Sequence, residues 1–184
     1  MEEINNYEDY SSLIFFNTFK IQIILMASHA KLEIKVALKI LKSLHEVFDA
    51  IVDPAKMTNY FISKSTGRME EGKTVTWQFP EFDMKFPVRV RKIEKDRNIS
   101  FSWTSPDGFE TLVEITLKQM DDGTFVTITE KSRDNDEEGL KWLRGNTEGW
   151  ANFLACLKAY LEYGINLRKG AFDISQMPVK EATV

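Results

Sequence analysis

One segment near the C-terminus constrains the fold more than any other: a long amphipathic helix that follows an almost purely β-patterned stretch. Gly149-Trp150 opens this segment, which runs to Leu161. Its apolar residues recur at three- and four-residue spacing and form one wide stripe, opposite a polar side. Such a stripe needs an apolar sheet face to cover, which predicts an α+β domain. The stripe contains Trp150, Phe153, Leu154, Leu157, Tyr160 and Leu161.

Length and charge narrow the classes of protein to consider. The chain has 184 residues, which suits one domain with a full core. Its 24 Lys and Arg residues against 28 Asp and Glu residues give a net charge of −4, so we expect neither nucleic acid nor an anionic membrane as a partner. The single cysteine, Cys156, cannot form an internal disulfide. Together with the lack of secretory features, this favours a reducing cytoplasm and an inert, packed thiol.

Both ends of the chain differ from its centre. Residues 1–30 have apolar runs too short to span a bilayer, and their acidic start does not match a signal peptide. Ordered patterning begins after Met26, so we predict that the first 25 residues are an appended extension and that Met26 is a candidate start. The alternative is an accessory helix or strand that docks on the domain. We therefore expect an extension over 1–30, a domain over 31–169 and a tail over 170–184.

The start of the domain alternates and then becomes helical. From Leu32 to Ile40 the even positions are apolar, which predicts a half-buried strand. Ser43 and Glu46 have the spacing of a capping box at the start of a short helix. Asp53-Pro54 then suits the start of a second helix, after which we expect an aromatic segment to pack inward. Its inward residues are Met57, Tyr60 and Phe61.

From Gly67 to Asp134 the pattern predicts five or six antiparallel strands joined by short hairpins. Pro80 and Pro87 remove ladder donors, which predicts bulges or a sheet edge near the third and fourth strands. We expect Ser100 and Ser102 to point outward. The final helix should begin near Glu137. The predicted inner face comprises Val75, Trp77, Phe79, Met84, Phe86, Val88, Val90, Ile99, Phe101, Trp103, Val113, Ile115, Leu117, Val126 and Ile128.

This order of elements resembles the helix-grip fold of the START-like, or SRPBCC, superfamily, also called Bet v-like, over roughly Lys31 to Lys169. More narrowly, Glu46–Ile51, Asp53–Lys56 and Asn146–Trp150 are similar to the branch named for the activator of the ninety-kilodalton heat-shock chaperone's ATPase. The resemblance implies an antiparallel meander of six to seven strands wrapped around a long C-terminal helix, with two short helices after the first strand. The tryptophan common after the second helix is replaced here by Asn59-Tyr60-Phe61, which alters the expected pocket shape.

No complete catalytic or metal-binding motif is present. His29 and His45 are too few and too far apart for a metal cluster, and we expect no cofactor. Glu130 is the weak catalytic candidate, because alternation from Ile128 directs it to the inner face. It is either a ligand anchor or acid at the cavity end, met by Arg144 or Tyr160, or it lies at a solvent rim where the strand has ended.

Two other features have alternative interpretations. Arg89, Arg91 and Lys92 form either a solvated outer face or a contact patch for an acidic protein partner. Gly145 and Gly149 in the final helix mark either a bend or close packing, or else a hinge at a cavity mouth.

The leading functional hypothesis is non-enzymatic binding of a small hydrophobic molecule, a lipid or an aromatic compound, between sheet and helix. The alternative is that the same side chains fill a solid core. The candidate ligand-binding residues are Trp77, Phe79, Phe86, Val88, Phe101, Trp103, Val113, Ile128, Trp150, Phe153, Leu154 and Leu157.

Two further functions follow from the resemblance alone. One is a chaperone-linked or stress-response interaction module, and the other is a cyclase- or aromatase-like enzyme in which Glu130 moves protons. The protein is expected to be a monomer or a homodimer. A dimer patch would use an edge near Pro80 or Pro87, or the aromatic pair Tyr60-Phe61.

Overall fold

The computed structural model describes residues 31–81, 83–105 and 108–171, together with Phe15, Thr18 and Lys20. The predictions about the N-terminal extension, the candidate start Met26 and His29 concern positions outside the described residues. The same holds for the tail from residue 172 onward.

A seven-stranded antiparallel sheet in the order β1-β7-β6-β5-β4-β3-β2 forms the framework of the domain. Strands β2 to β7 are sequential neighbours, so the predicted meander is confirmed, and β1 pairs with β7 at the other side. Edge strands are therefore β1 and β2. The strands are β1 (Lys31–Ile40), β2 (Lys64–Ser65), β3 (Thr74–Gln78), β4 (Lys85–Glu94), β5 (Asn98–Thr104), β6 (Glu110–Met120) and β7 (Gly123–Asp134).

Within residues 31–171, the helices that accompany the sheet are α2 (Leu44–Val52), α3 (Pro54–Met57) and α4 (Glu137–Tyr163). The predicted capping box is confirmed, since the Glu46 amide donates to Ser43 Oγ at 3.3 Å and the Ser43 amide donates to Glu46 Oε2 at 3.1 Å. Asp53 caps α3 and Pro54 occupies its first turn. Helix α4 ends at Gly164, whose φ of 67° lies in the left-handed region that glycine tolerates.

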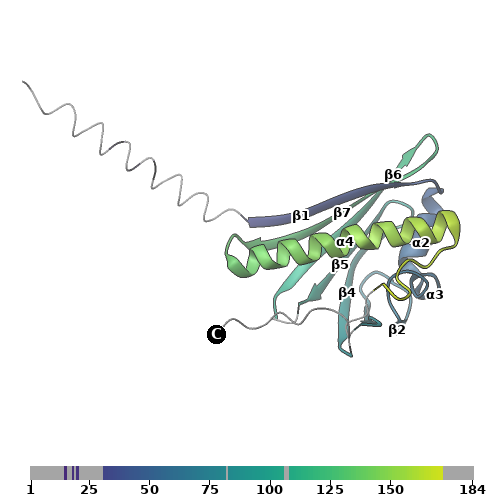
Figure 1. The fold of residues 1–184 in the computed structure, drawn as a ribbon, viewed down its shortest axis with the longest axis horizontal. Coiled ribbons are helices and arrows are strands. Elements are labelled where there is room, and N and C mark those ends of the chain that lie inside the picture. Colours follow the sequence, from purple (N-terminus) through teal and green to yellow (C-terminus); the bar gives the residue numbers. More distant parts are fainter. Residues whose placement is uncertain are drawn as a thin grey trace, which may run out of the picture.

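Helix α4 crosses one face of the sheet, while α2 and α3 lie beside its C-terminal end (Figure 1). Its closest backbone approach to the sheet is along β1. Side chains fill most of the wider space between α4 and the strands farther from β1, where they form one continuous hydrophobic core. This is the predicted helix-grip architecture.

The structure corrects several details of the predicted faces. Met84 is 48% exposed, because β4 begins only at Lys85. Ser100 and Ser102 alternate with core residues and lie on the outer face as predicted, but they are covered there: both are buried, and Ser102 Oγ accepts a hydrogen bond from Arg91 Nε at 2.9 Å. Of the two features predicted near Pro87, β4 has the bulge, a register shift between Val90 and Lys92, and not the edge, since it pairs with both β3 and β5.

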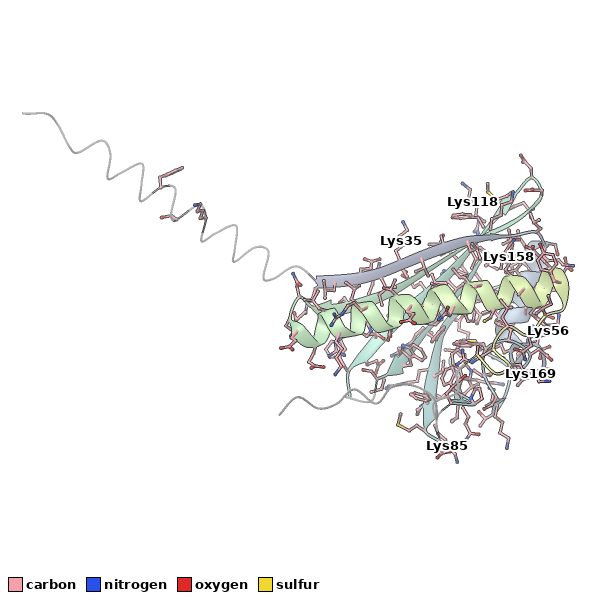
Figure 2. The ribbon with its side chains drawn as sticks, in the orientation of Figure 1. Lys35, Lys56, Lys85, Lys118, Lys158 and Lys169 are labelled. Carbon is pink, nitrogen blue, oxygen red and sulfur yellow. The ribbon has the colours of Figure 1, made fainter. Side chains whose placement is uncertain are left out.

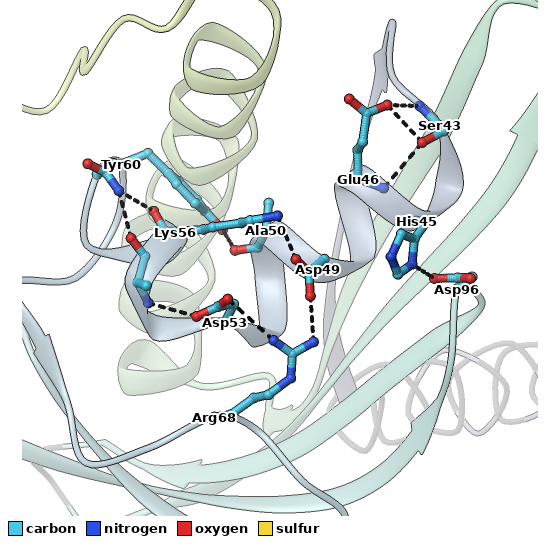
Figure 3. Close-up of polar contacts among 12 residues, drawn as sticks. Ser43, His45, Glu46, Asp49, Ala50, Asp53, Lys56, Tyr60, Arg68 and Asp96 are labelled. Carbon is cyan, nitrogen blue, oxygen red and sulfur yellow. Dashed lines mark hydrogen bonds and ion pairs between the residues drawn. The ribbon is translucent and has the colours of Figure 1, made fainter.

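An ion-pair cluster joins α2, α3 and the segment before β3 (Figure 3). Asp49 accepts from Lys56 Nζ and from Arg68 at 2.5 Å each, and Arg68 also pairs with Asp53 at 3.4 Å. The hydrogen bonds from Lys56 and Arg68 lower the pKa of Asp49 to about 2. The cluster fixes the α2–α3 turn from which the next aromatic segment leaves.

Tyr60 and Phe61 leave that turn and enter the core. The Tyr60 hydroxyl donates to the Ala50 carbonyl at 3.0 Å, and its ring stacks on Tyr160 of α4 at 5.6 Å. Burial raises the pKa of Tyr60 well above its ordinary value. Because Tyr60 and Phe61 are only 1% and 7% exposed, the predicted dimer patch built on these two residues is wrong.

Candidate functional site

A pocket of about 340 Å³ lies between the N-terminal half of α4 and the β3–β5 part of the sheet. Five aromatic side chains form its apolar wall, and the polar groups stand mainly on α4 and at one side. We call it the aromatic pocket. Its lining residues are Phe61, Phe79, Glu81, Phe86, Trp103, Gly145, Asn146, Glu148, Gly149, Trp150, Asn152 and Arg168.

The rings of the wall hold one another through edge contacts. Phe61 lies edge-on to Phe79, with ring centroids 5.2 Å apart, and edge-on to Phe153 of the core at 4.6 Å. Phe79 in turn contacts Phe86 at 5.3 Å, and Trp103 lies 5.5 Å from Trp150. Edge-to-face and tilted pairs are the favoured aromatic geometries, so the wall is a packed unit.

Directly beneath Trp103 and Trp150 lies the carboxylate of Glu130, which has 0% exposure. Its Oε1 accepts from Trp103 Nε1 at 2.9 Å and from Thr111 Oγ1 at 2.5 Å. Its Oε2 accepts from Trp150 Nε1 at 2.7 Å, and Asn146 Nδ2 donates to both oxygens at 3.2 and 3.1 Å. Four donors on β5, β6 and α4 therefore converge on one carboxylate and fix the two indole rings.

Of the two predicted positions for Glu130, the structure has the inner one. Strand β7 continues to Asp134, so alternation holds through Glu130 and keeps it off the solvent rim. Its partners on α4 are Asn146 and Trp150 rather than Arg144 or Tyr160. An indole N–H donates only, and pairing two of them with a carboxylate could not be foreseen from spacing within one element.

Gly145 and Gly149 both line the aromatic pocket. A Cβ built on either glycine meets nothing within 4 Å, whereas one built on Gly123 lies 2.3 Å from the Ile40 carbonyl oxygen. Close packing thus explains Gly123 and does not explain the two helix glycines. Both glycines are exposed, and open space lies beside them where they line the pocket.

Arg168 and Glu81 close one side of the aromatic pocket with an ion pair of 2.6 Å, their side chains 15% and 7% exposed. The Arg168 guanidinium lies 5.8 Å from the Phe61 ring centroid and 5.7 Å from that of Phe79, within cation–π range. Phe61, Glu81 and Arg168 also line a second pocket of about 350 Å³. The ion pair therefore stands between the two hollows.

Comparison with known proteins now places the chain in a family. The family model described as Activator of Hsp90 ATPase homolog 1-like protein, AHSA1, matches residues 43–162. The chain belongs to this family. The matched region runs from the cap of α2 almost to the end of α4, so it includes Glu130 and all four of its donors.

Solved structures agree with this AHSA1 assignment. Protein SSP2350 from Staphylococcus saprophyticus is 34% identical, with a TM-score of 0.65 over 74% of this chain and 96% of that chain. The Aha1 dimer from Colwellia psychrerythraea, 18% identical, gives a TM-score of 0.63 over 72% and 98%. CalU16 from Micromonospora echinospora, also 18% identical, gives 0.59 over 75% and 79%. The latter two support the fold alone. A search of curated proteins found no match.

The structure of this AHSA1 domain divides the twelve predicted ligand-binding residues into two groups. Phe79, Phe86, Trp103 and Trp150 line the aromatic pocket. The others lie in the hydrophobic core, so the filled-core interpretation describes the deeper part of the interface between helix and sheet. These core residues are Trp77, Val88, Phe101, Val113, Ile128, Phe153, Leu154 and Leu157.

Several pocket residues were not predicted. Phe61 was expected to pack inward, but its place in the pocket wall depends on the α2–α3 turn. Glu81 and Arg168 are far apart in sequence and meet only in the fold. Gly145 and Gly149 line the pocket, which agrees with the predicted position at a cavity mouth; two glycines four residues apart in a helix were the sequence signal for it.

The remaining charged features of this AHSA1 domain are paired or dispersed. Arg89 and Arg91 both pair with Glu110 at 2.7 Å, and Lys92 pairs with Glu94, which favours a solvated, neutralised outer face over a basic patch. Figure 2 shows the labelled lysines spread over the domain, at Lys35, Lys56, Lys85, Lys118, Lys158 and Lys169.

Three further observations concern metals, membranes and the thiol. The described residues include no group of three or more His, Cys, Asp or Glu side chains placed to hold a metal ion. None of the described helices combines the length and hydrophobicity that a membrane span requires. Cys156 is buried on α4, and this burial raises the pKa of its thiol.

Proposed function

We propose that this AHSA1-family domain binds a small hydrophobic molecule, with an aromatic body, in the aromatic pocket. The observation that carries the proposal is the pocket wall of Phe61, Phe79, Phe86, Trp103 and Trp150 around a volume of about 340 Å³. Small-molecule sites are concave, mostly apolar and contain a few placed polar groups. Asn146, Asn152 and the Glu81–Arg168 pair supply such groups here.

The two glycines of α4 support the same proposal. A glycine inside a helix costs about 1 kcal/mol relative to alanine, and alanine would fit sterically at both positions. That cost is understandable if the space above Gly145 and Gly149 is kept for a ligand. Since the rings around this space are already fixed by one another and by Glu130, the pocket is preorganised for a flat molecule.

Non-enzymatic binding is favoured over catalysis because Glu130 has no access to the aromatic pocket. Both of its oxygens are occupied by donors, and its side chain is covered by Trp103, Asn146 and Trp150. The catalytic role of Glu130 therefore stays a prediction. The chaperone-linked module, the homodimer and the cytoplasmic location also stay predictions.

The test combines ligand identification with a blocked pocket. Native mass spectrometry of the full chain purified from its own cells, followed by organic extraction, should show an added mass that yields a hydrophobic compound. Gly149→Leu should abolish this added mass, because the new side chain enters the pocket. Ala151→Leu is the matched control, since Ala151 is exposed on the same helix. Equal retention of the compound by Gly149→Leu would refute the proposed site.

A further inference from the structure

The carboxyl group of Glu130, beneath the aromatic pocket, has no cation beside it in the part of the chain that the structure describes. All four partners of Glu130 donate through N–H or O–H groups, an arrangement that suits the acceptor-only, ionised carboxylate. These donors are neutral, so they stabilise the charge without cancelling it. Glu130 forms no ion pair with any described residue.

Two other carboxylates that are nearly as buried are each paired with a cation. Glu162, with a side chain 4% exposed, pairs with Lys158 at 2.5 Å. Glu81, 7% exposed, pairs with Arg168 at 2.6 Å. Buried charges are normally paired in this way because an isolated charge is costly to desolvate. Glu130 departs from this rule, and it does so directly under the aromatic pocket.

The donors transmit this charge to the pocket. Trp103, Asn146 and Trp150 each donate to Glu130 and each line the pocket. A hydrogen bond from an indole N–H to a carboxylate polarises the ring toward higher electron density, since linked hydrogen bonds polarise one another in a low-dielectric interior. The faces of tryptophan rings are already the best partners for cations among aromatic side chains.

The other charged side chains that line the pocket are two carboxylates, Glu81 and Glu148, and one guanidinium, Arg168. Glu148 lies on the exposed rim, and Glu81 is neutralised by Arg168. With Glu130 counted, three carboxylates face one guanidinium, a net charge of −2. The one cation present, Arg168, lies over the rings of Phe61 and Phe79, so this wall already accepts a stacked cation from the chain itself.

We infer that the aromatic pocket selects an organic cation: a weakly hydrated positive group, such as a quaternary ammonium or pyridinium, carried on an apolar or aromatic body. Such a group loses little hydration on entering an aromatic site and gains both the ring quadrupoles and the field of Glu130. A compact ammonium pays more for desolvation. The inference rests on the proposed function and specifies its ligand class.

Three probes of equal shape or size test the inference on the full chain: phenyltrimethylammonium, its neutral isostere tert-butylbenzene, and benzenesulfonate. Binding is measured by protein NMR shifts and by quenching of tryptophan fluorescence. We expect the cation to bind about tenfold more tightly than the neutral isostere, which lies between the contributions of an exposed and of a desolvated cation–π contact, and the anion to bind most weakly.

Variants that remove a charge distinguish the electrostatic contribution of the carboxylates to binding from the contribution of pocket shape. Glu130→Gln keeps the side-chain shape and should bring the affinities of phenyltrimethylammonium and tert-butylbenzene together. Because the NH₂ group of Gln cannot accept from the donors around Glu130, a second variant that leaves these hydrogen bonds intact is also needed. Glu148→Gln at the exposed rim serves that purpose and should weaken only the cation, whereas Glu137→Gln, exposed at the start of α4 and outside the pocket lining, should leave all three affinities unchanged.

The outcomes distinguish this inference from the proposed function. Equal or tighter binding of tert-butylbenzene, blocked by Gly149→Leu, would overturn cation selection while the hydrophobic pocket stands. A cation preference that neither Glu130→Gln nor Glu148→Gln reduces would also overturn it. If none of the three probes binds but a co-purified compound is lost in Gly149→Leu, the inference fails and the proposed function stands; if the purified chain also carries no compound, both fail.

Discussion

The two halves of α4 cover the same face of one sheet but meet it differently. From Phe153 to Tyr160 the helix lies on a filled core, where Phe153, Leu154 and Leu157 are at most 2% exposed. From Gly145 to Asn152 the helix lines the aromatic pocket, and in this stretch only Trp150 is buried in the core. One continuous helix therefore serves as both core element and pocket wall.

The difference arises from side-chain size and from what supports each half. The C-terminal half presents large apolar groups and is held by Tyr60 and the α2–α3 turn. The pocket half, from Gly145 to Asn152, presents glycine and asparagine. The side chains of Asn146 and Trp150 anchor it by hydrogen bonds to Glu130. Directional polar anchors hold a helix in place without filling the space beside it, which is how a pocket persists next to a well-packed core.

The largest change in stability should come from removing a large side chain from the filled half of α4. Phe153→Ala removes a ring that contacts Tyr60, Phe61 and Trp150, and it should lower the free energy of unfolding by about 3–5 kcal/mol. Urea denaturation measures the loss. The companion variant Phe86→Ala, in the half-buried pocket wall, should cost clearly less. Equal losses for the two variants would remove the distinction between the halves.

Sequence patterns predicted the filled half far better than the pocket. Apolar spacing identifies Phe153, Leu154 and Leu157 because burial against a sheet imposes a simple period on one helix. The aromatic pocket depends on contacts between distant segments, such as Arg168 with Glu81 and Trp103 with Glu130. Periodicity within single elements contains no information on such meetings, so Glu130 was found by its face but its partners were not.

A smaller loss of stability is expected at the ion-pair cluster that holds the α2–α3 turn against the filled half of α4. Asp49→Asn removes the acceptor of Lys56 and Arg68 in the cluster of Figure 3. The pKa of Asp49 is about 2 in the folded protein and 3.8 as its ordinary value. Because the folded pKa is the lower one, its contribution is complete above about pH 4 and is lost as pH falls toward 2.

At pH 7 this substitution should lower the free energy of unfolding by about 1–2 kcal/mol, after allowance for solvent screening of a partly exposed group. Urea denaturation at pH 7 and again near pH 2 measures it, and the difference from the parent protein should shrink at the lower pH. The exposed pair Glu70–Lys73 supplies the control, since Glu70→Gln should change stability by less than about 0.5 kcal/mol. An Asp49→Asn loss that does not depend on pH would show that the cluster acts through shape and not charge.

In the pocket half of α4, replacing glycine with alanine should increase stability instead of lowering it. Gly145→Ala and Gly149→Ala add a Cβ to open space, and each should raise the free energy of unfolding by up to about 1 kcal/mol through helix propensity. Thermal and urea unfolding measure the gain. Gly123→Ala is the contrasting variant, and it should destabilise because its Cβ would lie 2.3 Å from a backbone oxygen. A loss of stability at Gly145 or Gly149 would mean that the space above α4 closes in solution.

The smallest effect is expected at Cys156, which is buried in the filled half of α4 and is not one of the residues that line the pocket. Its thiol is 6% exposed and its pKa is raised by burial, so labelling by a thiol reagent requires local opening of the C-terminal half of α4. The native protein should therefore react much more slowly than the urea-unfolded chain, and Phe153→Ala should accelerate the reaction. Saturating the aromatic pocket with phenyltrimethylammonium should leave the rate nearly unchanged if the two halves open independently. A strong slowing by the probe would instead show that ligand binding in one half of α4 stabilises the other.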